Sequence, residues 1–103
     1  MKVAEKIRNK KNNKSNEKRV IIEVIVLSGC SQCIPAAEMA YRVASQYNNV
    51  DVTLVNVTTP EGELKAKSLG IMTVPAIAIN GKLTFIGNIQ ADMIMHDAVR
   101  KAM

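Results

Sequence analysis

The sequence predicts an α/β domain in which helices cover both faces of a four-stranded mixed sheet. Two observations lead to this prediction. Apolar, β-branched runs alternate with amphipathic segments in the order β-α-β-α-β-β-α, and the last two strands flank Asn80-Gly81. A strand–helix–strand start implies a right-handed crossover and a parallel pair of strands. Asn-Gly between two apolar runs is the strongest short signal for a tight hairpin, which adds antiparallel strands.

The first half of this order is marked by its hydrophobic pattern. Residues 20–27 are nearly continuously apolar and β-branched, as expected for a strand that is buried on both faces. A helix is predicted over residues 35–47, where apolar residues recur at helical spacing before Asn48 and Asn49 end it. Residues 50–57 then form the second strand. These three elements make up the predicted parallel unit.

The second half is marked by capping and turn residues. Thr59 suits an N-cap and Pro60 the first position of a helix, and Gly70 is a fitting residue to end that helix. Residues 77–79 and 83–86 are the two strands of the hairpin. These local signals place the hairpin soon after the second helix.

The last helix is predicted to run from an N-cap at Asn88 to about Lys101. Its apolar positions recur at helical spacing, so they should face the sheet. The expected inner face consists of Ile89, Met93, Ile94 and Val99.

The positive charge of the chain is concentrated at its N-terminus. The 103 residues carry a net charge of +5, but residues 1–19 hold eight Lys or Arg against two Glu, which leaves residues 20–103 at −1. The first segment is polar and has little to bury. We therefore expect a basic, flexible N-terminal tail over residues 1–19 and one domain over residues 20–103.

The composition argues against a membrane-spanning protein and against a sequence-specific nucleic-acid-binding protein. The longest apolar stretch is far too short to span a bilayer, and the basic N-terminus lacks the apolar run of a signal peptide. A basic arm could contact an anionic polymer, but no aromatic residues are interleaved with it to stack on bases. We therefore expect a cytoplasmic protein with no membrane span and no specific nucleic-acid partner.

Two cysteines, Cys30 and Cys33, lie at the junction between the first strand and the first helix. A bridge across two intervening residues closes almost no loop, so it removes little entropy from the unfolded chain and is a poor structural staple. Secreted disulfide scaffolds carry more cysteines at wider spacing. The pair is therefore interpreted as a redox switch.

The position of the pair gives each cysteine a role. Unpaired N–H groups and the helix dipole favour a thiolate at a helix N-terminus, and a residue three positions later falls on the same face. We predict that Cys30 is the exposed nucleophile and Cys33 the buried resolving thiol of a thiol–disulfide exchange. Ser31 and Gln32 lie between them and bring uncharged hydrogen-bond donors that would tune the redox poise.

The alternative function is a non-enzymatic adaptor or soft-metal binder that uses the same two cysteines. A structural zinc site needs four ligands, and the other soft candidate in the sequence is His96, in the last helix. A site shared by two chains would meet that requirement. The redox interpretation needs no bound metal, and none is expected.

The segment Thr73-Val74-Pro75 leads directly into the third strand. Proline is permitted at this position because it need not donate to the sheet there. With Cys30-Ser31-Gln32-Cys33 after the first strand and Gly87 after the fourth, it makes residues 20–103 resemble a minimal thioredoxin fold of glutaredoxin size. The chain looks most similar to the small thioredoxins of archaea and anaerobic bacteria.

This resemblance implies a specific site and specific partners. Pro75 would follow a cis peptide bond beside the cysteines, and Val74, preceded by Thr73, would offer a strand-like edge to an extended substrate. The implied activity is that of a protein disulfide oxidoreductase, which acts on protein disulfide substrates and is recharged by a flavin-dependent disulfide reductase. It would need no cofactor beyond the Cys30–Cys33 disulfide itself.

The sequence departs from the larger family members in three respects. Thioredoxins usually carry Trp directly before the motif, whereas this chain has Gly29 and no tryptophan. The buried acid that helps thioredoxins deprotonate the second cysteine has no clear counterpart, and Glu23 on the first strand is the candidate for that role. Ser28-Gly29 and Gly87-Asn88 differ from the residues that glutaredoxins usually have at these places.

Overall fold

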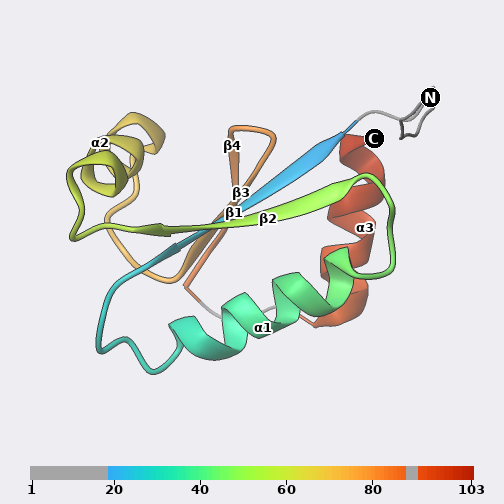
Figure 1. The fold of residues 1–103 in the computed structure, drawn as a ribbon, viewed down its shortest axis with the longest axis horizontal. Helices are drawn as coiled ribbons and strands as arrows, with labels where there is room; N and C mark the ends of the chain where they lie inside the picture. The colour runs from blue at the N-terminus through green and yellow to red at the C-terminus, as the bar shows by residue number, and fades with distance from the viewer. Residues whose placement is uncertain (1–18, 88–90) are drawn as a thin grey trace, which may run out of the picture.

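The computed structural model describes residues 19–87 and 91–103 and shows the predicted alternation of strands and helices (Figure 1). The elements follow one another as β1 (Val20–Val26), α1 (Cys33–Ala44), β2 (Val50–Asn56), α2 (Pro60–Leu69), β3 (Ala76–Ile79), β4 (Lys82–Ile86) and α3 (Asp92–Ala102). The predicted α/β fold class is confirmed. Residues 1–18 of the predicted tail lie outside the described residues. No helix in the described ranges is long and apolar enough to cross a membrane.

The strands form one mixed sheet in the order β2-β1-β3-β4. Strand β1 pairs in parallel with β2 and antiparallel with β3, and β3 pairs antiparallel with β4. Because β3 runs opposite to β1, the start of β3 lies beside the end of β1, with Ala76 opposite Ile25. This register brings the segment before β3 to the end of the sheet where β1 leads into the cysteines.

Side chains along β1 alternate between two hydrophobic layers. Val20, Ile22 and Val24 are fully buried on the face that α1 and α3 cover. Ile25 points to the other face, where it belongs to a second cluster that includes Leu69 of α2. Helices therefore cover both faces of the sheet, as predicted (Figure 1).

Helix α1 begins at Cys33 rather than Pro35 and ends at Ala44 rather than Tyr47. Pro35 is tolerated at the third helical position because the first N–H groups of a helix have no intrahelical partner. At the other end, the Tyr47 N–H donates to the Ala44 carbonyl in a tighter i→i+3 turn, so the apolar pattern continues beyond the α-helix. The earlier start makes Cys33 the first residue of the helix.

The hairpin and the caps of α2 follow the predicted local signals. Asn80 and Gly81 both have positive φ, of 52° and 80°, as the favoured two-residue hairpin turn requires. The Thr59 hydroxyl accepts a hydrogen bond from the Gly62 N–H at 3.0 Å and caps the start of α2, and Gly70 ends the helix in the left-handed conformation. Each strand boundary lies within one residue of its predicted position.

The predicted start of the last helix was wrong. Asn88, the predicted N-cap, lies outside the described residues, and α3 begins at Asp92 with Ala91 as its N-cap residue. Ala91 has the extended backbone of an N-cap but no side-chain oxygen with which to accept a hydrogen bond. Position 91 therefore lacks the Ser, Thr, Asp or Asn residue by which an N-cap is recognised in a sequence.

The predicted inner face of this helix was correct in part. Val99 is buried, and Met95, one turn before it, is buried as well. Met93 is 77% exposed and Ile94 is also exposed, so their assignment to the core was wrong, and Ile89 lies outside the described residues. Met95 and Val99 are the buried residues of α3 in the core cluster, and the partly buried Ala98 and Ala102 pack against the same cluster.

Candidate active site

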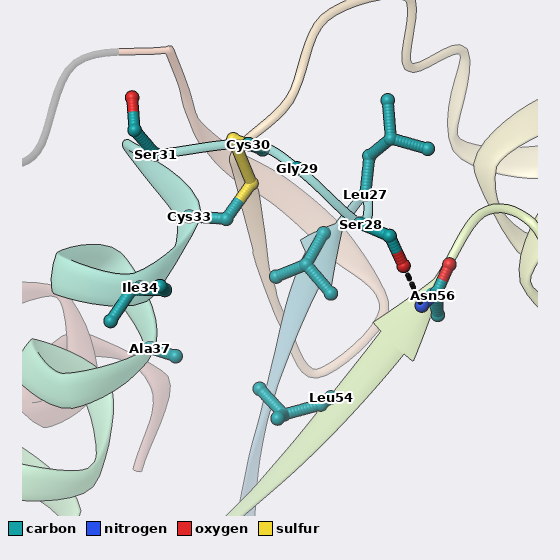
Figure 2. Close-up of a pocket in the computed structure, with 11 residues that line it drawn as sticks. Leu27, Ser28, Gly29, Cys30, Ser31, Cys33, Ile34, Ala37, Leu54 and Asn56 are labelled. Atoms are coloured by element: carbon teal, nitrogen blue, oxygen red, sulfur yellow. Dashed lines mark hydrogen bonds between the residues drawn. A yellow bond between two sulfur atoms is a disulfide. The ribbon is translucent and has the colours of Figure 1, made fainter.

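The two cysteines bracket a tight turn between β1 and α1. The Cys30 N–H donates to the Leu27 carbonyl at 3.1 Å, and the Cys33 N–H donates to the Cys30 carbonyl at 3.2 Å. Gly29 has a φ of 85°, a backbone conformation that residues other than glycine rarely adopt. The turn brings the Cα atoms of the two cysteines to 5.3 Å, within disulfide range, and their sulfurs are bonded (Figure 2).

The two cysteines differ in exposure. Cys33, the first residue of α1, is 4% exposed, whereas Cys30 is half-buried. A molecule that approaches the turn therefore meets Cys30 first. The assignment of Cys30 as nucleophile and Cys33 as resolving thiol agrees with this order.

The N-terminus of α1 carries no group that would oppose a negative charge. Gln32 is the N-cap residue, but its side chain makes no capping hydrogen bond, and no acidic residue lies in the first turn, all of which is described. The partial positive charge of the backbone N–H groups there favours a nearby thiolate. Ser31, the other predicted tuning residue, is exposed on the same turn.

The Val74–Pro75 peptide bond is cis, as the resemblance implied. Pro75 is buried, and its carbonyl accepts a hydrogen bond from the Gly87 N–H at 2.8 Å. The register of β3 against β1 puts Pro75 at the cysteine end of the sheet. Thr73 is exposed and Val74 is partly exposed just ahead of it. The fold thus brings the two predicted parts of the site, the cysteine turn and residues 73–75, to one end of the sheet.

A depression of about 580 Å³ opens beside the disulfide (Figure 2). Asn56, at the end of β2, lines it, and its Nδ2 lies 3.5 Å from the Ser28 Oγ of the cysteine turn. Asn56 was not among the predicted site residues, because this contact joins residues that lie 28 positions apart in the sequence. The local sequence indicates only a turn at the end of β2, where the Asn56 Oδ1 accepts a hydrogen bond from the Thr58 N–H at 2.9 Å, as asparagine side chains favour in turns.

The family of the chain is decided by comparison with known proteins. A family model of the thioredoxin domain matches residues 20–99. The chain belongs to the thioredoxin family. A thioredoxin of Methanocaldococcus jannaschii is 34% identical to this thioredoxin-family chain over 86 residues, which cover 82% of the chain and 98% of that protein. A probable thioredoxin of Methanothermobacter thermautotrophicus is 35% identical over 69 residues, which cover 66% of the chain and 79% of that protein.

Two solved structures share the thioredoxin fold of the chain at moderate identity. A protein disulfide oxidoreductase of Aeropyrum pernix matches with a TM-score of 0.68 at 30% identity, and the NTD_N/C domain of alkylhydroperoxide reductase AhpF of Enterococcus faecalis matches with 0.68 at 27%. The matches cover 84% and 79% of this chain but 38% of each of the two other chains. With its cysteines joined, this thioredoxin-family chain is a redox protein and, in general terms, a thiol–disulfide oxidoreductase.

Glu23 does not replace the buried acid of larger thioredoxins. Its side chain is 13% exposed, and its Oε2 lies 3.0 Å from the Nζ of Lys65 on α2. Helix α2 covers the face of the sheet opposite to α1, which carries Cys33. Glu23 is therefore held in an ion pair on the other face of the sheet and is not placed to accept a proton from Cys33.

His96 packs against Tyr47 rather than against the cysteines of this thioredoxin-family site. Its Nδ1 lies 2.9 Å from the Tyr47 hydroxyl, and the two ring centroids are 5.6 Å apart. Cys33 begins α1 and Tyr47 follows its end, so a helix of 12 residues, about 18 Å long, lies between them. Within residues 19–87 and 91–103, no three His, Cys, Asp or Glu side chains are grouped closely enough to hold a metal ion.

The ion pair between Arg42 on α1 and Asp92 at the start of α3 should make stability depend weakly on pH. Two hydrogen bonds of 2.8 and 2.9 Å join the side chains, and they hold the pKa of Asp92 below its usual range. A lowered carboxyl pKa stabilises the fold above the unfolded-state value of about 3.9, and this contribution is lost as pH falls through the folded-state value. Because both groups are exposed, the effect should be small.

This prediction can be checked by thermal unfolding between pH 2 and pH 7. Asp92→Asn should lower the melting temperature slightly at pH 7, and the difference from wild type should vanish at the acid end. Arg42→Gln should have the same effect, and the double variant should be no worse than either single variant. Additive losses at pH 7 would show that the two side chains act independently.

Proposed function

We propose that this protein exchanges its Cys30–Cys33 pair with disulfides of partner proteins. The observation that carries the proposal is the disulfide at the start of α1, in which Cys30 is half-buried and Cys33 is buried. An accessible sulfur can form a mixed disulfide with a large partner, while a buried sulfur at bonding distance can resolve it. The bridge closes too short a loop to act mainly as a staple.

In the reducing direction, the reaction begins with two thiols and ends with the disulfide of this structure. The Cys30 thiolate attacks one sulfur of the substrate disulfide, forms a mixed disulfide and releases the other substrate sulfur as a thiolate. The Cys33 thiolate then attacks the Cys30 sulfur, forms the Cys30–Cys33 bond and releases the second substrate thiolate. The protein loses two electrons and two protons, and the substrate gains them.

Substrate binding is assigned in this proposal to Thr73, Val74 and Pro75. The location of Pro75 at the cysteine end of the sheet and the exposure of Thr73 support this assignment. An extended substrate segment would pair with the main chain of Val74 as an added strand. Ser31 and Gln32, which are exposed and uncharged, would tune the stability of the Cys30 thiolate.

The reduced state is proposed to be restored by a flavin-dependent disulfide reductase. The likeness to a domain of an alkylhydroperoxide reductase supports a partner of the reductase class. The protein needs no other cofactor in this scheme, because the two sulfurs carry both electrons. We place the reaction in the cytoplasm, where thiols are kept reduced and cysteine pairs serve exchange rather than stapling.

The proposal is tested by a redox titration in graded dithiothreitol buffers, with thiol alkylation as the readout. We expect a reversible two-electron transition between about −180 and −300 mV, the range of exchange catalysts. Ser31→Ala keeps both cysteines, so it should keep the transition, but the midpoint potential should shift because Ser31 is proposed to tune the Cys30 thiolate. A protein whose thiols are protected at every potential, and which retains one soft metal ion per chain or per dimer, would contradict the proposal and support the metal-binding alternative.

A further inference from the structure

The depression beside the disulfide lies on the opposite side of β1 from the proposed substrate strand. In the sheet order β2-β1-β3-β4, Pro75 precedes β3 on one side of β1, whereas Leu54 and Asn56 line the depression from β2 on the other side. Ile34 and Ala37 of α1 form the facing wall (Figure 2). The cysteine turn is therefore flanked by two separate surfaces, and the assigned function uses one of them.

The lining of this depression is uncharged and largely apolar. Apart from the two cysteines, its residues are Val26, Leu27, Ser28, Gly29, Ser31, Ile34, Ala37, Leu54 and Asn56. Ile34 is 64% exposed and Leu54 is 48% exposed, so apolar surface faces water at the edge of the redox site. A charged group placed here would lose hydration and find no ionic partner, whereas an apolar group would bury this surface. The chemistry of the lining therefore selects an uncharged, apolar occupant.

The surroundings of the depression favour a peptide over a small molecule. Gly29 leaves open space where a side chain would stand, because apart from Gly29 itself and its two chain neighbours no described residue has an atom within 4 Å of the position of a Cβ. A partner backbone can therefore approach the turn closely, while its side chain enters the depression.

We propose that this depression receives a large apolar side chain that lies within two residues of the target cysteine of a partner protein. This inference rests on the proposed function and adds a sequence preference to it. Cys30 and Cys33 both line the depression, so a group bound there lies beside the Cys30 sulfur that attacks the substrate disulfide. Successive residues of an extended segment are about 3.3 Å apart, so a side chain one or two residues away can reach the apolar walls.

The test compares two synthetic peptide disulfides that differ in the residue next to cysteine, Leu in one and Ser in the other. Reduced protein is mixed with each peptide, and the second-order rate constant is divided by the rate constant for dithiothreitol with the same peptide. Wild type should prefer the Leu peptide about tenfold, as expected for an apolar side chain in an apolar pocket. Leu54→Ser should bring the preference close to one.

Leu64→Ser is the matched control, since Leu64 is a 68% exposed leucine of α2 that does not line the depression. It should keep the full preference. Ile34→Ser, at a more exposed position of the lining, is a second test variant in case Leu54→Ser does not fold. A preference that survives in both lining variants would overturn the inference.

The outcomes separate the inference from the function on which it rests. Equal normalised rates for the two peptides in wild type would overturn the inference and leave the exchange function standing. Equal peptide rates with faster reduction of a dialkyl disulfide would assign the depression to a small molecule and overturn it too. A dimer in sedimentation that is lost in Leu54→Ser would assign it to a second copy of the chain, again against the inference. Failure to reduce either peptide would overturn the proposed function itself.

Discussion

Replacing Cys30 with Ser should reduce the turnover of a protein disulfide to the rate without protein. A serine hydroxyl is not ionised near neutral pH and cannot form a disulfide, so the first step of the exchange is lost completely. The measurement is the reduction of insulin by dithiothreitol, followed as turbidity, with and without the variant. The loss should be complete rather than partial, because Cys33 is buried and cannot take over the attack.

Cys33→Ser distinguishes the two roles of the pair. This variant keeps the accessible Cys30, so it should attack the substrate and remain attached to it as a mixed disulfide, which mass spectrometry of the non-reduced sample detects. Ser31→Ala is the control for substitutions within the turn and should remain active. An active Cys30→Ser variant, or a Cys30→Ser variant that forms the mixed disulfide through Cys33, would contradict the assignment.

The second large effect is expected at Gly62, where alanine should destabilise the fold by about 3 kcal/mol. A Cβ at this buried position of α2 would overlap the Asn56 carbonyl oxygen and lie 3.0 Å from the Thr59 Oγ1. Both neighbours are tied to the connection between β2 and α2, since the Thr59 N–H and hydroxyl both bond to the Asn56 carbonyl. The helix or the end of β2 would therefore have to move.

The sign of this effect makes it a sharp test. In an exposed helix, Gly→Ala stabilises by about 1 kcal/mol through helix propensity, so overlap and propensity predict opposite outcomes. Urea and thermal unfolding of Gly62→Ala measure the difference, and the melting temperature should fall by roughly 12–24 °C. Ser68→Ala, an exposed change on the same helix, should be within about 0.5 kcal/mol of wild type. A neutral or stabilising Gly62→Ala would show that α2 does not approach Asn56 so closely in solution.

The parts of the fold that depend on neighbouring residues could be predicted from the sequence. The hairpin turn at Asn80-Gly81 and the N-cap at Thr59 are each decided within four residues, and both were correct. The start of α1 was placed two residues late because proline was taken as the first helical residue, while its missing N–H is tolerated anywhere in the first turn. Met93 was assigned to the core from spacing alone, although the buried stripe of α3 begins at Met95.

The parts of the site that depend on distant residues could not be predicted. Glu23 pairs with Lys65, and no local pattern reveals which face of a strand buried on both sides an acid will occupy. Asn56 meets Ser28 only because β1 and β2 end side by side. The depression is likewise lined by residues of β1, the cysteine turn, α1 and β2, and only the folded arrangement of these segments brings them together.

The position of β1 at the centre of the sheet has a consequence for incomplete chains. One edge of β1 bonds to β2, which is in the same half of the chain, and the other edge bonds to β3, more than 50 residues later. A chain that stops after β2 contains both cysteines and the helix that carries Cys33, but it lacks the strand that completes the sheet and the segment around Pro75. Such a fragment could still undergo thiol chemistry, while its central strand would be an open edge that invites association with other chains. The proposed exchange with a partner protein therefore requires both halves of the chain, because the cysteines come from one half and the segment around Pro75 comes from the other.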